Sequence, residues 1–86
     1  MFEKIMSKNL GKSHEVRVEK STYTFSNGTE TYIYVMVINH DVCWENKEYF
    51  DTVDEAVEFF NRFKTVSDCK NFIKNNTFPK EVREDR

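Results

Sequence analysis

The sequence predicts a single α+β domain, in which a three-stranded antiparallel β-meander carries one or two C-terminal helices on one face. Three observations lead to this fold class: an Asn-Gly dipeptide between two alternating segments, a helix-capping motif further along the chain, and a length of 86 residues that leaves room for one core. We place the domain in residues 1–78 and a charged tail in residues 79–86.

Residues 14–25 and 29–39 are expected to form a β-hairpin. Asn27-Gly28 favours a two-residue type I′ turn, because both of its central residues need a positive φ. This turn would pair residues whose numbers add to 55, for example Tyr23 with Tyr32.

The alternation of side chains then defines two faces of the hairpin. The aliphatic face holds Val16, Val18, Ile33, Val35 and Val37, and the aromatic face holds Tyr23, Phe25, Tyr32, Tyr34, Met36 and Ile38 with Arg17 and Glu19. Both faces are apolar enough to be covered by helices. We favour the aliphatic face as the floor beneath Phe60 and Phe63.

The remaining elements follow from shorter patterns. A third strand is expected within residues 42–50, where Val42 and Trp44 alternate as in a half-buried strand. Phe2, Ile5 and Met6 have the spacing of a short helix over residues 2–9.

The C-terminal helices show clearer signals. Thr52 and Glu55 form a capping box, and an apolar stripe follows it, made of Val53, Ala56, Val57, Phe60 and Phe63 with Phe59 on its flank. Ser67 is expected to cap a second helix that ends near Asn75 and Asn76.

Catalytic and metal-binding motifs are weak in this chain. With two glycines, the sequence contains neither a P-loop nor a dinucleotide-binding fingerprint. His40-x-x-Cys43, with His14 and Cys69, is only half of a zinc-type spacing, and neither cysteine has the flanking residues of a nucleophile. We therefore expect no enzyme activity, no metal and no cofactor; a minimal cysteine- or metal-dependent enzyme is the less favoured alternative.

Charge is sorted along the chain, and this points to a first binding surface. Residues 21–58 hold eight acids and one base, whereas both ends of the chain are basic. We call seven of these acids the acidic belt: Asp41, Glu45, Glu48, Asp51, Asp54, Glu55 and Glu58. Clustered carboxylates of this kind can dock on a basic protein surface, although such a run is often only a solvated face.

The aromatic face is a second candidate surface. Tyr23, Phe25, Tyr32 and Tyr34, with Arg17, Lys12 and Lys20 nearby in sequence, resemble the stacking faces of single-stranded nucleic-acid binders. A homodimer interface or cover by the N-terminal helix would equally account for these aromatic residues.

The stretch YFDTVDEAVEFFNRF after a β-meander resembles the strand-to-helix junction of small phage-encoded proteins. The size and element order are also similar to acidic phage inhibitors of CRISPR nucleases. This resemblance implies a protein that acts in the host cytoplasm, away from membranes, by occupying the surface of a host macromolecule. The expected function is non-enzymatic binding of a host protein, including one that handles nucleic acid; the alternative is an RNA- or single-stranded-DNA-binding module.

Overall fold

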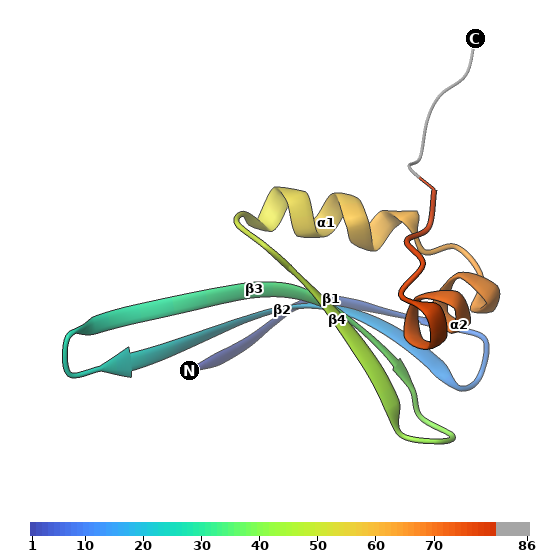
Figure 1. Ribbon diagram of the computed structural model, residues 1–86, viewed down its shortest axis with the longest axis horizontal. Coiled ribbons are helices and arrows are strands. Elements are labelled where there is room, and N and C mark those ends of the chain that lie inside the picture. The colour runs from blue at the N-terminus through green and yellow to red at the C-terminus, as the bar shows by residue number, and fades with distance from the viewer. Residues whose placement is uncertain (81–86) are drawn as a thin grey trace, which may run out of the picture.

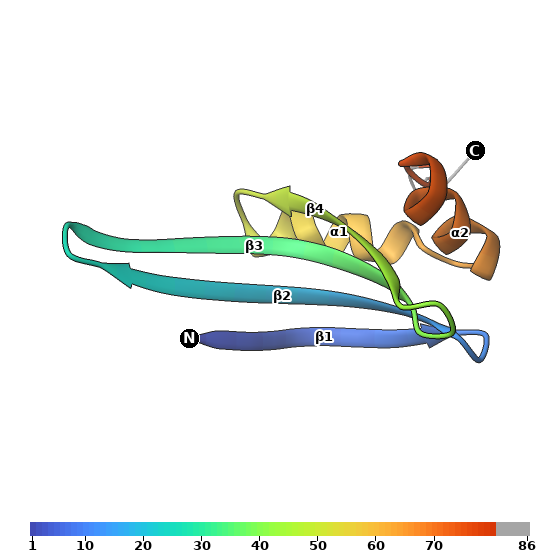
Figure 2. The ribbon, with the colours of Figure 1, turned by 60° about the horizontal axis from the view of Figure 1, so that its bottom comes forward.

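The computed structural model describes residues 1–80, and in it a four-stranded antiparallel sheet carries two helices on one face (Figure 1). The strands are β1 (Phe2–Leu10), β2 (His14–Phe25), β3 (Gly28–Asn39) and β4 (Trp44–Phe50), and they lie side by side in chain order (Figure 2). The helices are α1 (Val53–Arg62) and α2 (Val66–Asn75). The α+β class is confirmed, whereas the prediction of three strands is wrong by one strand.

The extra strand is β1, where the sequence predicted a helix over residues 2–9. β1 pairs with β2 along its whole length, and the register shifts between Lys4 and Met6. This β-bulge leaves Ile5 unpaired and allows both Ile5 and Met6 to pack against the core. The bulge thus places two adjacent apolar residues on the core side of the strand, and their spacing in the sequence resembles that of a helix.

The β2–β3 hairpin forms as predicted, but its turn is displaced. Ser26 and Asn27 are the two turn residues, Gly28 already belongs to β3, and Phe25 pairs with Gly28. Partner numbers therefore add to 53 and not to 55, so Tyr23 lies opposite Glu30. Gly28 has a φ of 143°, which glycine tolerates without a Cβ clash. The predicted register is thus wrong by two residues. Because side chains alternate between the two faces of a strand, a shift by two leaves every side chain on its predicted face.

β4 lies within the predicted third strand, but its first residues are not half-buried. Val42 lies in the turn between β3 and β4, Trp44 begins β4, and both side chains are exposed. The polar residues that follow belong to the strand: Asn46, for example, donates its side-chain N–H to Phe72 O of α2 at 2.9 Å.

Both helices begin at threonine caps. The Thr52 hydroxyl accepts from Glu55 N, which confirms Thr52 as the cap, but of the predicted capping box only this one hydrogen bond forms within residues 1–80. The predicted cap at Ser67 is wrong, because the cap of α2 lies two residues earlier, at Thr65. The Thr65 hydroxyl accepts from Asp68 N, while the Asp68 carboxylate accepts from Thr65 N. This reciprocal pair satisfies two backbone donors, which a serine inside the first turn could not do. α2 ends at Asn76 in the left-handed conformation, as expected.

The core lies between the helices and the aliphatic face of the sheet, which confirms the predicted floor. Its fully enclosed members are Val16, Val18, Val35, Val37, Ala56, Phe59, Phe60, Phe63, Cys69 and Phe72. Phe59 is central, since its ring contacts those of Phe50, Phe63, Phe72 and Phe78 at centroid distances of 5.2 to 5.8 Å. The sequence placed Phe59 only on the flank of its helix.

The β2–β3 hairpin extends past the rest of the sheet, as Figure 2 shows. β4 pairs with β3 only up to Ile33, and the pairing of β1 with β2 ends at Phe2 and Ser21. We call residues 22–31 of this hairpin the arm. The arm projects beyond both helices (Figure 1), and Tyr23 and Phe25 on it are about half exposed.

Candidate functional site: an acidic–aromatic groove

An open groove lies where β4 ends and the chain turns up toward α1. It has a volume of about 1200 Å³ and is lined by the base of the arm, the last residues of β4 and the outer side of α1. The lining residues are Ser21, Tyr23, Thr31, Tyr32, Ile33, Tyr34, Lys47, Tyr49, Phe50, Asp51, Asp54, Glu55, Glu58 and Arg62. We call this feature the acidic–aromatic groove.

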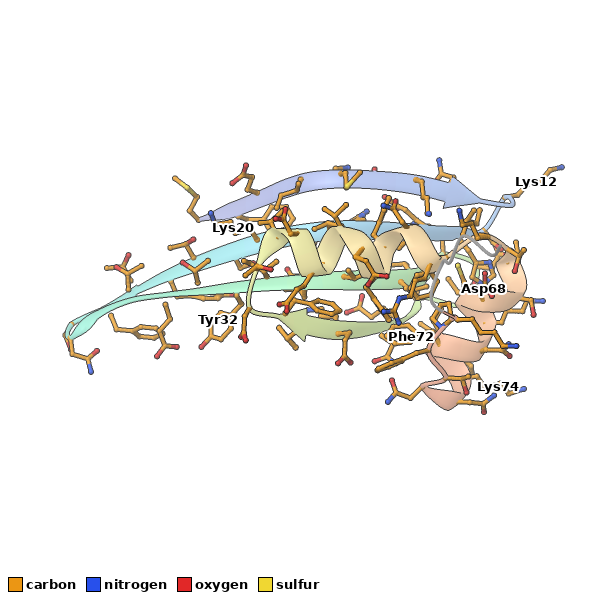
Figure 3. All side chains as sticks on the ribbon, turned by 90° about the horizontal axis from the view of Figure 1, so that it is seen from above. Lys12, Lys20, Tyr32, Asp68, Phe72 and Lys74 are labelled. Carbon is orange, nitrogen blue, oxygen red and sulfur yellow. The ribbon has the colours of Figure 1, made fainter. Side chains whose placement is uncertain are left out.

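Four tyrosines form one wall of the groove. The rings follow one another edge to face, with centroid distances of 5.8 Å from Tyr23 to Tyr32, 6.4 Å from Tyr32 to Tyr49 and 5.4 Å from Tyr49 to Tyr34. Figure 3 shows Tyr32 on the β4 side of the hairpin. Such a row offers several ring faces, whose negative potential attracts cations.

The hydroxyl groups of this wall are held in different ways. Tyr34 OH shares a hydrogen bond of 3.2 Å with Ser21 Oγ, and burial raises the pKa of Tyr34. Tyr32 OH donates to the Glu30 carboxylate, which raises the pKa of Tyr32. Both tyrosines are therefore neutral at physiological pH.

Carboxylates form the opposite wall. Asp51 follows β4, and Asp54, Glu55 and Glu58 lie on α1, where all four side chains are exposed. Within residues 1–80, Glu58 alone among the four makes an ion pair, with Arg62 at 2.9 Å. The helix N-terminus contributes only about half a positive charge here, so this wall is negative overall.

A cation already lies against the tyrosine wall. The Lys47 ammonium is 4.9 Å from the centroid of the Tyr34 ring. This contact occupies a face of Tyr34, which is buried, whereas the rings of Tyr23, Tyr32 and Tyr49 are exposed.

The structure brings together four of the seven acidic-belt residues. Asp51, Asp54, Glu55 and Glu58 line the groove, whereas the other three lie elsewhere. Asp41 lies in the β3–β4 turn at the far end of β4, and Glu45 pairs with Ile38 near that turn. Glu48 pairs with Val35 on the face that the helices cover.

The predicted aromatic face divides in the same way. Tyr23, Tyr32 and Tyr34 line the groove, while Phe25 lies at the tip of the arm. Of the basic residues expected beside them, Lys12 lies in the β1–β2 turn at the opposite end of the sheet from Tyr32 (Figure 3), and Lys20 lies opposite Ile33 on β2 but does not line the groove.

Arg17 remains on the uncovered sheet face but is engaged by its own strand. Its guanidinium donates to Glu15 at 2.8 and 3.2 Å and to Glu19 at 3.3 Å. The hydrogen bonds from Arg17, with a smaller contribution from His40, lower the pKa of Glu15 to about 2. Glu19 is buried, and its Oε1 has no hydrogen-bond partner among residues 1–80. Arg17 thus pairs with two carboxylates and is not free to bind phosphate.

The cysteines and histidines do not converge. His40 and Cys43 share the exposed β3–β4 turn. Cys69 lies on the buried side of α2, where burial raises the pKa of its thiol to about 11. His14 is buried and accepts or donates one hydrogen bond with Ser13 at 3.0 Å. The described residues contain no group of three His, Cys, Asp or Glu side chains arranged to hold a metal ion.

Sequence reasoning missed Lys47, Tyr49, Phe50 and Arg62 as groove residues. For Tyr49 a signal was present, because it alternates with Glu45 and Lys47 once residues 44–50 are treated as one strand. The role of Arg62 depends on how α1 packs above β4, and no local pattern encodes this.

No protein-family model, no curated protein and no solved structure matches this chain. In the described part of the chain, no helix is both long enough and apolar enough to cross a membrane.

Proposed function

We propose that this chain is a non-enzymatic binding protein whose acidic–aromatic groove holds a basic segment of a partner protein. The observation that supports this most is that one groove combines Asp51, Asp54 and Glu55, which are free of ion pairs within residues 1–80, with a wall of tyrosine rings. Lysine and arginine side chains interact favourably with both groups, through charge pairing and through cation–π contacts.

Occupying a basic surface would make the protein a competitor for the natural ligand of that surface. If the partner normally binds nucleic acid, the carboxylates of the groove would take the place of phosphates. An inhibitory or modulating role against a host protein, including a defence factor encountered by a phage, is the biological form of this proposal.

The rival function, binding of RNA or single-stranded DNA, has less support. Stacking sites for nucleic acid combine aromatic residues with cations that contact the backbone phosphates. Here the cations in the groove are Lys47 and Arg62, against four carboxylates, and Arg62 is paired with Glu58. Phosphates would be repelled from the wall opposite the tyrosines.

The two functions are distinguished by fluorescence anisotropy with two labelled probes, a capped peptide of alternating Lys and Val residues and a short oligothymidylate. We expect the peptide to bind, with an affinity that falls as salt increases. Glu55→Lys should weaken this affinity roughly tenfold, because one attractive charge becomes repulsive. Glu3→Lys is the matched control, since Glu3 is an exposed acid on β1 outside the groove.

Two results would contradict the proposal. One is tighter binding of the oligothymidylate than of the peptide, abolished by Tyr32→Ala. The other is an equal loss of peptide affinity in Glu55→Lys and Glu3→Lys, which would mean that only net charge matters.

A further inference from the structure

β3 has a free edge inside the groove. β3 pairs with β2 as far as Gly28, but its pairing with β4 stops at Ile33 and Phe50. Residues 28–32 of β3 therefore have a strand on one side only in the part of the chain that the structure describes.

The direction of the backbone groups on this edge can be derived from Thr22. Thr22 donates its N–H to Met1 O at 2.7 Å, and its C=O accepts from the Met1 amino group at 2.5 Å. Both groups of Thr22 thus point away from β3. In an antiparallel pair, opposite residues exchange either both hydrogen bonds or none, so its partner Thr31 also points its N–H and C=O outward. By the same alternation Thr29 points outward as well.

This edge lacks the protection that exposed strand edges usually carry. The outer edge strand β1 contains Lys4, Lys8 and a β-bulge, all of which discourage pairing with a foreign strand. Residues 28–32 of β3 contain Glu30 as their only charged residue, no proline and no bulge. The unprotected edge is the one that lies between the carboxylates and the tyrosines.

From these observations we infer that the basic partner segment binds as an added β-strand along the free edge of β3, in the line of β4 beyond Phe50. Its backbone would exchange hydrogen bonds with Thr29 and Thr31, as in other cases of strand addition. This inference rests on the proposed function and specifies how the groove is used.

The geometry also constrains the sequence of the partner segment. Successive side chains of a strand point to opposite faces, so every second side chain would face the side of α1 and its carboxylates, and the others would face Tyr23 and Tyr32. The preferred segment therefore has Lys or Arg at alternate positions, with apolar or aromatic residues between them.

Thr31→Pro tests strand addition directly. Because the Thr31 N–H points outward, proline removes a donor to the partner and leaves the β2–β3 hydrogen bonds in place. We expect Thr31→Pro to weaken binding of the alternating Lys-Val peptide at least tenfold. Thr31→Val is the matched control, since it also loses the 3.4 Å hydroxyl contact with Thr22 but keeps the N–H, so its affinity for the peptide should exceed that of Thr31→Pro at least tenfold.

Amide hydrogen exchange of the wild-type protein gives a second measurement that needs no variant to fold. Saturating peptide should slow exchange at Thr29 and Thr31, whereas Glu30 and Tyr32, whose N–H groups already point toward β2, should change little. Unchanged exchange at Thr29 and Thr31 under saturation would overturn the inference.

The outcomes separate this inference from the proposed function. If Glu55→Lys weakens the peptide and Thr31→Pro does not, strand addition is wrong while the basic-segment groove stands. If neither variant weakens it, both are wrong. A second copy of this chain is the other possible occupant of the edge, and sedimentation analysis tests for it. If the wild-type protein is a dimer, and Thr31→Pro dissociates the dimer without changing the affinity for the peptide, the edge binds a second copy and the inference is wrong.

Discussion

Glu15 shows how a single residue ties stability to pH. Arg17 and His40 both contact its carboxylate, at 2.8 Å in each case, on the uncovered face of the sheet. The pKa of Glu15 is about 2 in the folded protein and about 4.5 ordinarily, so folding favours the ionised form. Its contribution, at most about 3 kcal/mol, is complete above pH 4.5 and is lost as the pH falls toward 2.

We therefore expect Glu15→Gln to flatten the dependence of the melting temperature on pH between 4.5 and 2. Above this window the variant should melt at a lower temperature than wild type, and the difference should shrink as the pH falls. Thermal unfolding followed by circular dichroism measures both effects. Glu45→Gln, which changes an exposed acid on β4, is the control; an identical pH profile for wild type and Glu15→Gln would contradict the assignment.

For single residues, the sequence predicted the sheet face on which a side chain lies better than it predicted the residue opposite it on the neighbouring strand. The prediction put Tyr32 opposite Tyr23, whereas Tyr32 pairs with Ser21, because the turn begins at Ser26 and not at Asn27. A shift by two residues conserves the alternation, so the aliphatic and aromatic faces were correct even though the register was not. The two tyrosines still touch, as diagonal neighbours.

Among the elements, α2 shows how a cap determines where a helix begins. The Thr65 hydroxyl and the Asp68 carboxylate bind each other's backbone N–H at 3.1 Å in both directions. Ser67 lies inside the first turn and is exposed. Thr65 and Asp68 have the spacing of a capping box with Asp in place of Glu, so the sequence does contain a signal for this cap.

Thr65→Ala should accordingly lower the free energy of unfolding by about 1 kcal/mol, as loss of an N-cap typically does. Ser67→Ala should change it by less than about 0.5 kcal/mol, as expected for an exposed position without a cap. Urea unfolding of both variants makes the comparison. If Ser67→Ala is the more damaging change, the helix begins where the sequence first suggested.

The strand β1 could not be predicted from local sequence patterns, for a different reason. Its apolar residues do not alternate, because the bulge at Ile5 places two neighbours on the core side. Only its pairing with β2 makes it a strand, and Lys8 then donates to Phe60 O at 3.0 Å, satisfying a carbonyl near the end of α1. Long-range contacts of this kind override a local helical spacing.

For the whole molecule, stability is concentrated in one aromatic cluster beneath the helices. Phe59 is 2% exposed and links Phe50 of β4, Phe63, Phe72 of α2 and Phe78. The arm, by contrast, has exposed side chains and contributes little to this core.

Phe59→Ala is therefore expected to lower the free energy of unfolding by about 3–5 kcal/mol, whereas Phe25→Ala on the arm should lower it by less than about 1 kcal/mol. Urea denaturation measures both values. Phe59→Leu, with a smaller expected loss, serves if the alanine variant does not fold. Similar losses at Phe25 and Phe59 would mean that the arm is part of the cooperative core.

The groove itself depends on relations that only the complete fold establishes. Tyr23, Tyr32 and the acids of α1 were each singled out in the sequence, but as two separate surfaces. They meet because β4 is shorter than β3 and because the chain turns back over the sheet at Asp51. Strand lengths and the path of this turn follow from packing between distant segments, which no single stretch of sequence reveals.

The position of Trp44 has a practical consequence for spectroscopy. This single tryptophan lies at the exposed start of β4, whereas the groove lies at the other end of that strand, among four tyrosines. Excitation selective for indole would therefore be insensitive to a ligand in the groove and would respond weakly to loss of the core. Tyrosine emission and the near-ultraviolet dichroism of the phenol rings are the signals that follow occupancy, and the indole provides an internal reference in the same cuvette.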